Sequence, residues 1–302
     1  MVSRCPILDV RGRICDATGH AKLGTLVGTY KMLGEHVEVA IPAALQRGYR
    51  LFDTAAIYRN EEHVGRVLRE QMEAEGIRRE DVFVTSKLQT LDQGYDKARA
   101  AVDASLQKLG LGYIDLYLIH WPGASATEPS DPRNATLRRE SWKALEEALA
   151  AGKLRAIGVS NYMVRHLQEM EGYAQVPPMV NQIELHPLYY PRDVVQYCQQ
   201  RGILVQAYSS LGRGKLLGDA FLAAHPPIAH MMHRHGASAG QVYLRWALQH
   251  NFGILPKSND PGRIATNADL FGFVLDPAEM QYLDDLSLQE WNKICWDPQG
   301  VA

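Results

Sequence analysis

Short apolar segments alternate with amphipathic segments along nearly the whole chain, and this alternation limits the folds that the sequence can adopt. Eight stretches have the composition of strands buried on both faces: residues 49–55, 82–88, 114–121, 155–161, 179–186, 204–211, 253–258 and 270–274. Between them, apolar residues recur at helical spacing, as Tyr95, Ala98 and Val102 do. No linker divides the run. The sequence therefore predicts an α/β fold, a (β/α)8 TIM barrel that forms a single domain over residues 1–302, with a short N-terminal hairpin near residues 7–14 and a short C-terminal tail.

Local signals bear on two of the expected helices. Asn60 can cap the helix that follows the first of these strands, because Glu61 and Glu62 then lie at the positive end of the helix dipole. Pro42 lies within the helical-looking residues 37–45, where an interior proline costs about 3 kcal/mol. We therefore expect a helix that either begins just before Pro42 or is kinked there.

The composition excludes several classes of protein. Of the 302 residues, 46% are hydrophobic and 22% are charged, as in ordinary globular proteins. A net charge of −2 gives no basic field for nucleic acid and no polybasic patch for a membrane. Residues 1–6 lack the apolar core of a signal peptide, and no apolar run is long enough to span a bilayer. The cysteines are scattered and form no Cys-x-x-Cys motif, so we expect reduced thiols in a cytoplasmic protein. They are Cys5, Cys15, Cys198 and Cys295.

Ionisable residues lie at the carboxyl ends of three consecutive predicted strands. Asp53 ends the first of these strands, and Tyr58 follows it by five residues. Lys87 ends the second strand, and His120 ends the third. In an eight-stranded parallel barrel this edge is where active sites are built, so we expect the four side chains to converge there.

These four residue types can protonate a carbonyl oxygen. A tyrosine with a pKa of about 10 is a poor acid at neutral pH, but a nearby ammonium such as that of Lys87 favours the phenolate and lowers the pKa. A carboxylate can hold the lysine in place, and the imidazole can orient the oxygen while a hydride is delivered to the carbon. Taken singly, Asp53–Lys87 is also compatible with a structural ion pair, and His120 with a core histidine. Their joint placement favours catalysis.

Seven separated motifs resemble those of the aldo-keto reductase family in their order and spacing. They are Gly48-Tyr49-Arg50-Leu51-Phe52-Asp53-Thr54-Ala55, Thr85-Ser86-Lys87, Leu118-Ile119-His120-Trp121-Pro122, Ile157-Gly158-Val159-Ser160-Asn161, Asn181-Gln182-Ile183-Glu184-Leu185-His186-Pro187, Ala207-Tyr208-Ser209 and Leu255-Pro256-Lys257-Ser258. The resemblance implies that Tyr58 is the proton donor and that Lys87, anchored by Asp53, tunes it. His120 is then expected to position the carbonyl group.

The resemblance also implies NADPH/NADP+ as the cofactor, bound in an extended pose over the barrel. No Gly-x-Gly-x-x-Gly motif follows a strand, so a Rossmann site is unsupported. The implied cofactor-binding residues are Gly28, Thr29, Asp53, Ser160, Asn161, Gln182, Tyr208, Ser209, Leu211, Lys257, Ser258, Asn259, Arg263 and Asn267. Among these, Ser160, Asn161 and Gln182 are expected to bind the carboxamide, and Tyr208 to stack on the nicotinamide ring. The alternative for the Ser160-Asn161 pair is a helix N-cap.

A phosphate site is expected near residue 260. Lys257, Ser258 and Arg263 surround a short helix that begins around Asp260-Pro261, and cations at a helix N-terminus bind phosphate. The implied ligand is the 2′-phosphate of NADP(H), although Asp260 adds a negative charge beside it. The alternative is a solvated basic turn.

The expected substrate pocket is lined by Tyr30, Trp121 and His120, with Trp296 at its rim. No metal is expected. The histidine-rich residues 230–235 invite a metal site, but the first and last of them do not share one helix face and no nearby ligand completes it.

The sequence thus predicts an NADPH-dependent oxidoreductase, in which Tyr58 protonates small-molecule aldehydes and ketones as they are reduced to alcohols. A monomer without nucleic acid or membrane partners is expected. One alternative is an NADPH-binding accessory or sensor protein with little turnover, since fold alone does not determine function. A metal-dependent barrel hydrolase is a weaker alternative. The intact set of four catalytic residue types favours the enzyme.

Overall fold

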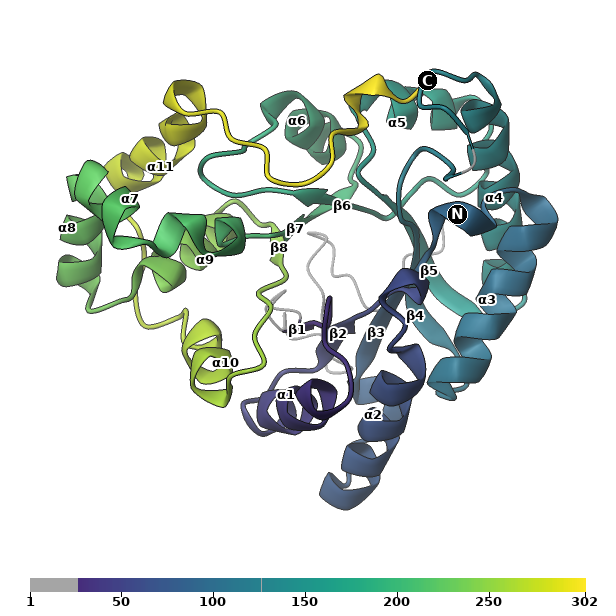
Figure 1. The fold of residues 1–302 in the computed structure, drawn as a ribbon, viewed down its shortest axis with the longest axis horizontal. Helices are drawn as coiled ribbons and strands as arrows, with labels where there is room; N and C mark the ends of the chain where they lie inside the picture. The colour runs from purple at the N-terminus through teal and green to yellow at the C-terminus, as the bar shows by residue number, and fades with distance from the viewer. Residues whose placement is uncertain (1–26, 126) are drawn as a thin grey trace.

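The computed structural model describes residues 27–125 and 127–302, and within them eight parallel strands form one sheet in the order β1 to β8 (Figure 1). The strands are β1 Val27–Gly28, β2 Leu51–Asp53, β3 Phe83–Leu88, β4 Ile114–Ile119, β5 Leu154–Ser160, β6 Val180–Glu184, β7 Leu204–Tyr208 and β8 Gly253–Ile254. The helices are α1 Glu35–Gln46, α2 Glu61–Glu75, α3 Tyr95–Leu109, α4 Arg133–Ala150, α5 Val164–Glu171, α6 Arg192–Gln200, α7 Asp219–Ala224, α8 Pro226–His235, α9 Ala239–Gln249, α10 Pro261–Ala268 and α11 Pro277–Gln289. The expected hairpin near residues 7–14 lies outside the described residues.

The sheet curls until its two edge strands meet. The backbone N–H of Gly28 in β1 donates a hydrogen bond of 3.4 Å to the carbonyl of Pro256, which follows β8. Figure 1 shows the helices arranged around the outside of this ring of strands. The prediction of a single (β/α)8 barrel is therefore confirmed.

Alternate residues of each strand face two different cores, because successive side chains of a strand point to opposite faces. In β4, Leu116 and Leu118 belong to a small cluster inside the barrel. Tyr117 and Ile119 belong to the larger core between the strands and the helices. All of these side chains are fully buried, and each buried aliphatic side chain stabilises the fold by about 1.5–3 kcal/mol.

The predicted strand at residues 270–274 is wrong. This segment joins α10 to α11 without strand structure, and two of its side chains, Phe271 and Val274, are 46% and 62% exposed. A central barrel strand is covered on both faces, which this segment is not. The place in the barrel belongs to β1, whose two residues are too few to give an apolar run in the sequence.

Asn60 precedes α2 as expected, but its side chain does not cap the helix. Its amide nitrogen instead donates to the backbone carbonyls of Thr29 and Met32, at 3.0 and 2.9 Å. Its amide oxygen accepts a hydrogen bond of 2.6 Å from Thr54. The buried amide thus fastens the segment after β1 to the end of β2.

Helix α1 runs from Glu35 through Pro42, so a helix that starts just before Pro42 is wrong. The proline removes one backbone hydrogen bond from the helix interior. The opposing contribution comes from a fully buried face that includes Val37, Ile41 and Leu45.

The described ranges contain no helix that has both the length and the hydropathy needed to cross a bilayer.

Helices α2 and α3 approach closely at Gly65, and this contact gives a test of the packing. A Cβ atom at Gly65 would collide with the backbone carbonyl of Leu109. Helix propensity alone predicts that Gly65→Ala stabilises the protein by about 1 kcal/mol. We expect the opposite, a loss of about 2–3 kcal/mol in the free energy of unfolding, because the backbone of α3 must move.

Urea denaturation measures this difference, and Gly272→Ala is the control. A Cβ at Gly272 would meet no atom within 4 Å, so its effect should stay within about 0.5 kcal/mol. A Gly65→Ala protein as stable as the parent would contradict the close packing of these helices.

Candidate active site

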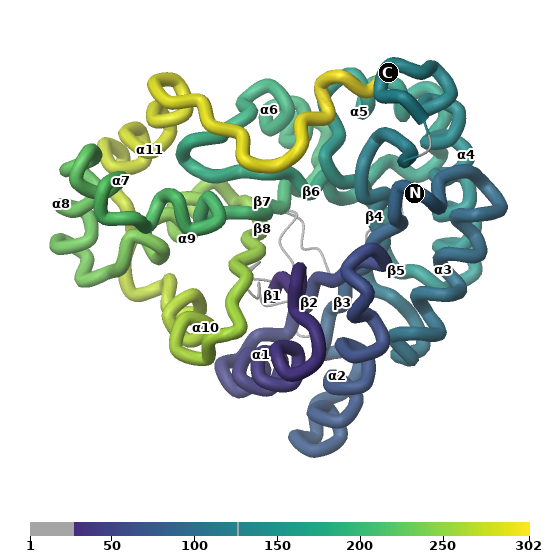
Figure 2. The backbone as a smooth tube through the Cα atoms, viewed as in Figure 1, coloured from purple at the N-terminus to yellow at the C-terminus, as the bar shows by residue number. Residues whose placement is uncertain are grey.

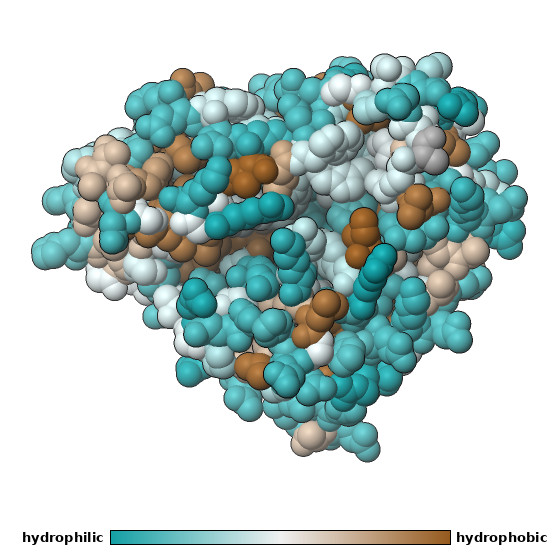
Figure 3. Space-filling model, viewed as in Figure 1, coloured by the Kyte–Doolittle hydropathy of each residue, from teal (hydrophilic) through white to brown (hydrophobic). Residues whose placement is uncertain are grey.

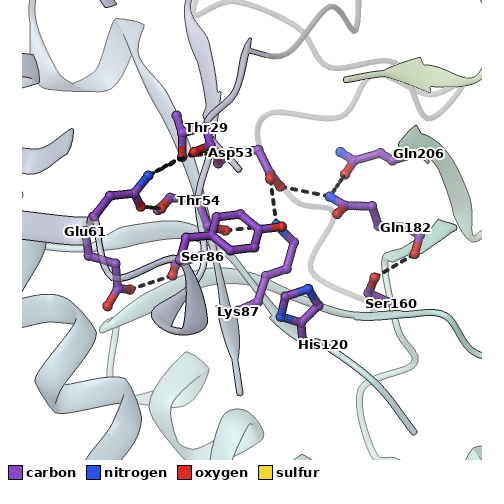
Figure 4. Close-up of polar contacts among 12 residues, drawn as sticks. Thr29, Asp53, Thr54, Glu61, Ser86, Lys87, His120, Ser160, Gln182 and Gln206 are labelled. Carbon is purple, nitrogen blue, oxygen red and sulfur yellow. Dashed lines mark hydrogen bonds and ion pairs between the residues drawn. The ribbon is translucent and has the colours of Figure 1, made fainter. Parts of the chain in front are cut away.

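A fully buried ammonium group joins two of the residues predicted from the strand ends. Lys87 Nζ donates hydrogen bonds to Asp53 Oδ1 at 2.6 Å and to the carbonyl of Thr54 at 2.9 Å. It also lies 3.4 Å from the hydroxyl of Tyr58, which belongs to the 3-10 turn Ala56–Tyr58 after β2. Figure 4 shows Asp53 and Lys87 pointing toward each other, with His120 beside the lysine. The expected convergence of the strand ends is therefore confirmed for these residues.

Burial sets the protonation states of this group. It lowers the pKa of Lys87 below its ordinary value, and the charge of Asp53 opposes this shift. Burial and then Asp53 raise the pKa of Tyr58 well above 10. The expected lowering of the Tyr58 pKa is therefore not found in this structure, where desolvation of the phenolate and the charge of Asp53 both raise the pKa. Tyr58 keeps its proton at neutral pH.

His120 follows β4 and faces the ring of Tyr58, with the two ring centroids 5.7 Å apart. Burial, and then the charge of Lys87, lower the pKa of His120 well below 6.5, so the imidazole is neutral at pH 7. Its Nδ1 atom is buried and has no hydrogen-bond partner among the described residues. A buried polar atom without a partner is costly, and a polar ligand at this position would satisfy it.

Two glutamines extend the chain of hydrogen bonds across the barrel interior. Gln182 Nε2 donates to Asp53 Oδ2 at 2.9 Å and to Gln206 Oε1 at 3.1 Å (Figure 4). Both oxygens of Asp53 are thus engaged, one by Lys87 and one by Gln182. This arrangement holds the carboxylate in one orientation.

The residues expected to bind the carboxamide lie together. Asn161 Nδ2 donates to the backbone carbonyl of His120 and to Ser160 Oγ, both at 3.0 Å. Asn161 Oδ1 accepts a hydrogen bond of 2.6 Å from the hydroxyl of Tyr208. Asn161 has a φ of 65°, in the left-handed region that asparagine tolerates better than most residues. Ser160 belongs to β5, so the alternative of a helix N-cap is wrong for it; α5 begins only after Met163.

Three cations gather at the junction of β1 and β8. Arg263 and Lys31 both lower the pKa of Lys257, after a larger lowering by burial. Helix α10 starts at Pro261 as expected, but Asp260 caps it by accepting a hydrogen bond of 2.8 Å from the backbone of Arg263. Cations that repel one another at a helix N-terminus are stabilised by a bound anion, so this cluster fits a phosphate group.

The other residues expected at the cofactor site are spread along the same edge of the barrel. Thr29 Oγ1 donates to the carbonyl of Asp53 at 2.9 Å. Ser209 Oγ lies 3.7 Å from Cys295 Sγ, and Leu211 precedes the turn Gly212–Leu217. Gly28, Ser258, Asn259 and Asn267 lie in β1, in the segment after β8 and in α10.

Aromatic rings line the mouth above Tyr58. The Tyr30 ring lies 5.1 Å from Tyr58 and the Trp121 ring lies 6.3 Å from His120, measured between centroids. Trp296 from the C-terminal tail contacts Trp121, with centroids 4.8 Å apart, as expected for a residue at the rim. Figure 3 shows that this face of the molecule is hollowed near its centre, with apolar residues beside the hollow.

The histidine-rich residues 230–235 form part of α8. Within the part of the chain that the structure describes, no group of three His, Cys, Asp or Glu residues could hold a metal ion.

Sequence reasoning missed several residues of this site. Gln206 interrupts an apolar strand at the position paired with Gln182, and this register is what brings it to the site. Glu61 is buried and accepts a hydrogen bond of 2.6 Å from Ser86, and its charge raises the pKa of Lys87. Lys31 joins the cation cluster. A polar residue inside an apolar strand is a signal that could have revealed Gln206; Lys31 gives no such signal.

Comparison with known proteins agrees with this geometry. The family model described as "Aldo/keto reductase family" matches residues 19–288. Glyoxal reductase of Bacillus subtilis is 41% identical over 265 residues, covering 87% of this chain and 88% of that protein.

Solved structures are similar over the same length. An aldo-keto reductase from a Medee basin deep-sea metagenome library has a TM-score of 0.82 and 34% identity, covering 95% of this chain and 98% of that chain. The Bombyx mori aldo-keto reductase, solved in complex with NADP, has a TM-score of 0.79 and 32% identity, covering 90% and 92%. The protein described here is therefore an oxidoreductase that belongs to the aldo/keto reductase family.

Proposed function

We propose that Tyr58 protonates the oxygen of an aldehyde or ketone while Lys87, Asp53 and His120 support the transfer. As a member of its family, the protein is an NADP(H)-dependent oxidoreductase that reduces carbonyl compounds to alcohols. The observation that carries the assignment is the buried ammonium of Lys87, which contacts both Asp53 and the Tyr58 hydroxyl.

The protonation states support a division of labour. Bound NADPH supplies a hydride to the carbonyl carbon. The Tyr58 hydroxyl, which retains its proton at neutral pH, donates it to the oxygen as negative charge develops there. The charge that then forms on the phenol is stabilised by the ammonium 3.4 Å away. Lys87 therefore stabilises the transition state of proton transfer more than it changes the pKa of Tyr58 before the reaction.

Neutral His120 orients the substrate. Its ring faces Tyr58, and a neutral imidazole can donate or accept one hydrogen bond without competing for the proton. Gln182 and Gln206 hold Asp53 from the far side, which keeps the lysine aimed at the phenol. These residues position the reacting groups within a largely water-excluded site.

The cofactor residues are proposed on the same basis. Ser160, Asn161 and Tyr208 form one hydrogen-bonded group beside His120, where a carboxamide and a flat ring find donors, acceptors and an aromatic face. Lys257 and Arg263 fit the adenosine 2′-phosphate. We assign the same site to Gly28, Thr29, Gln182, Ser209, Leu211, Ser258, Asn259 and Asn267.

The substrate is proposed to be a small aldehyde or α-dicarbonyl compound, aromatic aldehydes included. The aromatic rings of Tyr30, Trp121 and Trp296 give the mouth an apolar lining that suits a flat substrate. Similarity to a glyoxal reductase supports dicarbonyl compounds.

We further propose a monomer in the cytoplasm. Asp53, Lys87 and Gln182 already bond to one another within the chain, so this part of the site needs no residue from a second copy. The net charge of −2 and the free thiols of Cys198 and Cys295 suit a reducing aqueous compartment without nucleic acid. Sedimentation of the purified protein tests the oligomeric state.

Removal of one hydroxyl tests the proton donor. We expect Tyr58→Phe to lower kcat for reduction of a benzaldehyde by at least about 100-fold, which is the usual contribution of a general acid. The affinity for NADPH, measured by fluorescence titration, should change little. Tyr95→Phe on the outer helix α3 is the control. Undiminished turnover of Tyr58→Phe would remove Tyr58 from its proposed role.

The pH dependence of kcat/KM tests the protonation states. Because the pKa of Tyr58 lies well above 10 and that of His120 well below 6.5, neither group changes charge near neutrality. We expect kcat/KM for reduction to stay level between about pH 6.5 and pH 9. A phenol with a lowered pKa would lose its proton in this range, and the rate would fall as pH rises. Such a fall would contradict the level profile: it would mean that Tyr58, or Lys87 with its lowered pKa, loses its proton in this range.

Discrimination between cofactors tests the cation cluster. Arg263→Gln should raise KM for NADPH about tenfold or more, because a charge-assisted hydrogen bond contributes about 1.5–3 kcal/mol. KM for NADH, which lacks the phosphate, should change much less. Arg78→Gln, at an exposed arginine outside the cluster, is the control. Equal effects on both cofactors would place the 2′-phosphate elsewhere.

A further inference from the structure

The C-terminal tail, residues 290–302, runs along the rim of the barrel mouth (Figure 2). Figure 2 shows it as a yellow tube that leaves α11, crosses above β6 and ends near α5. Its last residues are held by arginines: Arg138 donates to the carbonyl of Ala302, and Arg165 donates to that of Val301 at 2.7 Å. The inner part, residues 293–295, is held by a different group.

A single buried carboxylate fastens the inner part of the tail. Glu184, the last residue of β6, accepts hydrogen bonds from the backbone N–H of Ile294 at 2.7 Å and of Cys295 at 2.9 Å. It also accepts one from Lys293 Nζ at 2.9 Å, and His186 Nε2 lies 3.3 Å away. The side chain of Glu184 is fully buried. The mechanism proposed above does not use this group.

The tail residues next to this anchor border the substrate pocket. Cys295 lies against Ser209 at the end of β7, and the next residue, Trp296, packs edge-on against Trp121. Ile294 approaches Gly212, the first residue of the turn Gly212–Leu217 that crosses beside the mouth. The positions of these three neighbouring tail residues therefore depend on the hydrogen bonds to Glu184.

The anchor requires a carboxylate. Both oxygens face donors: Oε1 meets the N–H of Ile294 and Oε2 meets Lys293 and the N–H of Cys295. Burial raises the pKa of Glu184, but the bonds from His186 and Lys293 outweigh it and lower the pKa to about 2. The group is therefore ionised over the whole working range. A glutamine has the same shape, but its NH2 group would face another donor.

We propose that Glu184 is a positioning residue for substrate selection: it fixes residues 293–296, and through them holds Trp296 against Trp121 as one wall of the pocket. The inference rests on the proposed function of that pocket. Burying a carboxylate costs desolvation free energy, which its hydrogen-bond partners must offset. The proposal gives Glu184 a role that accounts for its burial. Binding of a substrate large enough to contact Trp296 therefore depends on Glu184, and binding of a small substrate does not.

Two measurements on Glu184→Gln test the proposal. The first compares a naphthaldehyde with glyoxal: we expect KM for the bulky aldehyde to rise about tenfold or more, with a smaller change in kcat and in the KM for glyoxal. The second follows the reaction of Cys295 with a thiol reagent, using a Cys295→Ser counterpart of each protein as the blank. Release of the tail should accelerate this reaction at least about fivefold, since local opening exposes the thiol.

Lys293→Met is a second variant that removes one donor and leaves the backbone bonds to the carboxylate intact. It should raise KM for the bulky aldehyde and the rate of the Cys295 reaction by smaller factors than Glu184→Gln does. It replaces Glu184→Gln as the test if that variant does not fold. Glu279→Gln is the matched control, because Glu279 is also buried and bound by Arg234 and His235, but lies in α11 away from the pocket. It should leave the substrate ratio and the thiol rate at the parent values.

The outcomes separate this inference from the proposed function. If the parent reduces neither substrate, the proposed function fails, while the thiol reaction still reports on the tail. If the parent is active and Glu184→Gln keeps both the substrate ratio and the thiol rate, the role of Glu184 is overturned. A rise of both KM values by the same factor would also overturn it, because that result indicates a general disturbance of the site. The role of Glu184 would likewise be overturned if Glu279→Gln changed the substrate ratio and the thiol rate as much as Glu184→Gln does.

Discussion

The site depends on one buried charge pair, the ammonium of Lys87 and the carboxylate of Asp53. A buried ammonium without a partner is strongly disfavoured, so the pair persists only because the carboxylate lies 2.6 Å away and the carbonyl of Thr54 accepts another hydrogen bond. The remaining face of the lysine is directed to the Tyr58 hydroxyl. The same desolvation that makes the pair costly also keeps Tyr58 protonated and His120 neutral.

The barrel supplies the rigidity that this pair needs. Asp53 and Lys87 lie in neighbouring strands whose register is fixed by parallel pairing, and Gln182 reaches Asp53 from across the interior. Side chains on regular strands are held more tightly than side chains on loops. Tyr58 lies in the turn after β2, and the buried Asn60 fixes that connection to the segment after β1. The geometry of the proposed catalytic residues therefore depends on contacts that also hold the strands and their connections together.

Much of this arrangement could be predicted from the sequence, because the strands buried on both faces are continuous apolar runs and the ionisable residues stand at their ends. The sequence could not identify β1, since two residues carry no periodic signal. The apolar connection at residues 270–274 has the composition of a strand but is not one. Nor could the sequence give the direction of the Tyr58 pKa, which is decided by how deeply the hydroxyl is buried and not by which cation is near. Contacts between distant segments, such as Glu184 with the tail, leave no local pattern at all.

The closure of the barrel has a consequence for how the protein responds to its cofactor. Among the described residues, the join between β1 and the segment after β8 has one long backbone bond, from Gly28 to Pro256, whereas the central strands share full ladders. Lys31, after β1, and Lys257, after β8, lie on opposite sides of this junction. A cofactor phosphate bound between these two lysines, as proposed above, would add its binding free energy to this junction of the ring. The enzyme with bound cofactor should therefore resist opening at this junction more strongly than the enzyme without it.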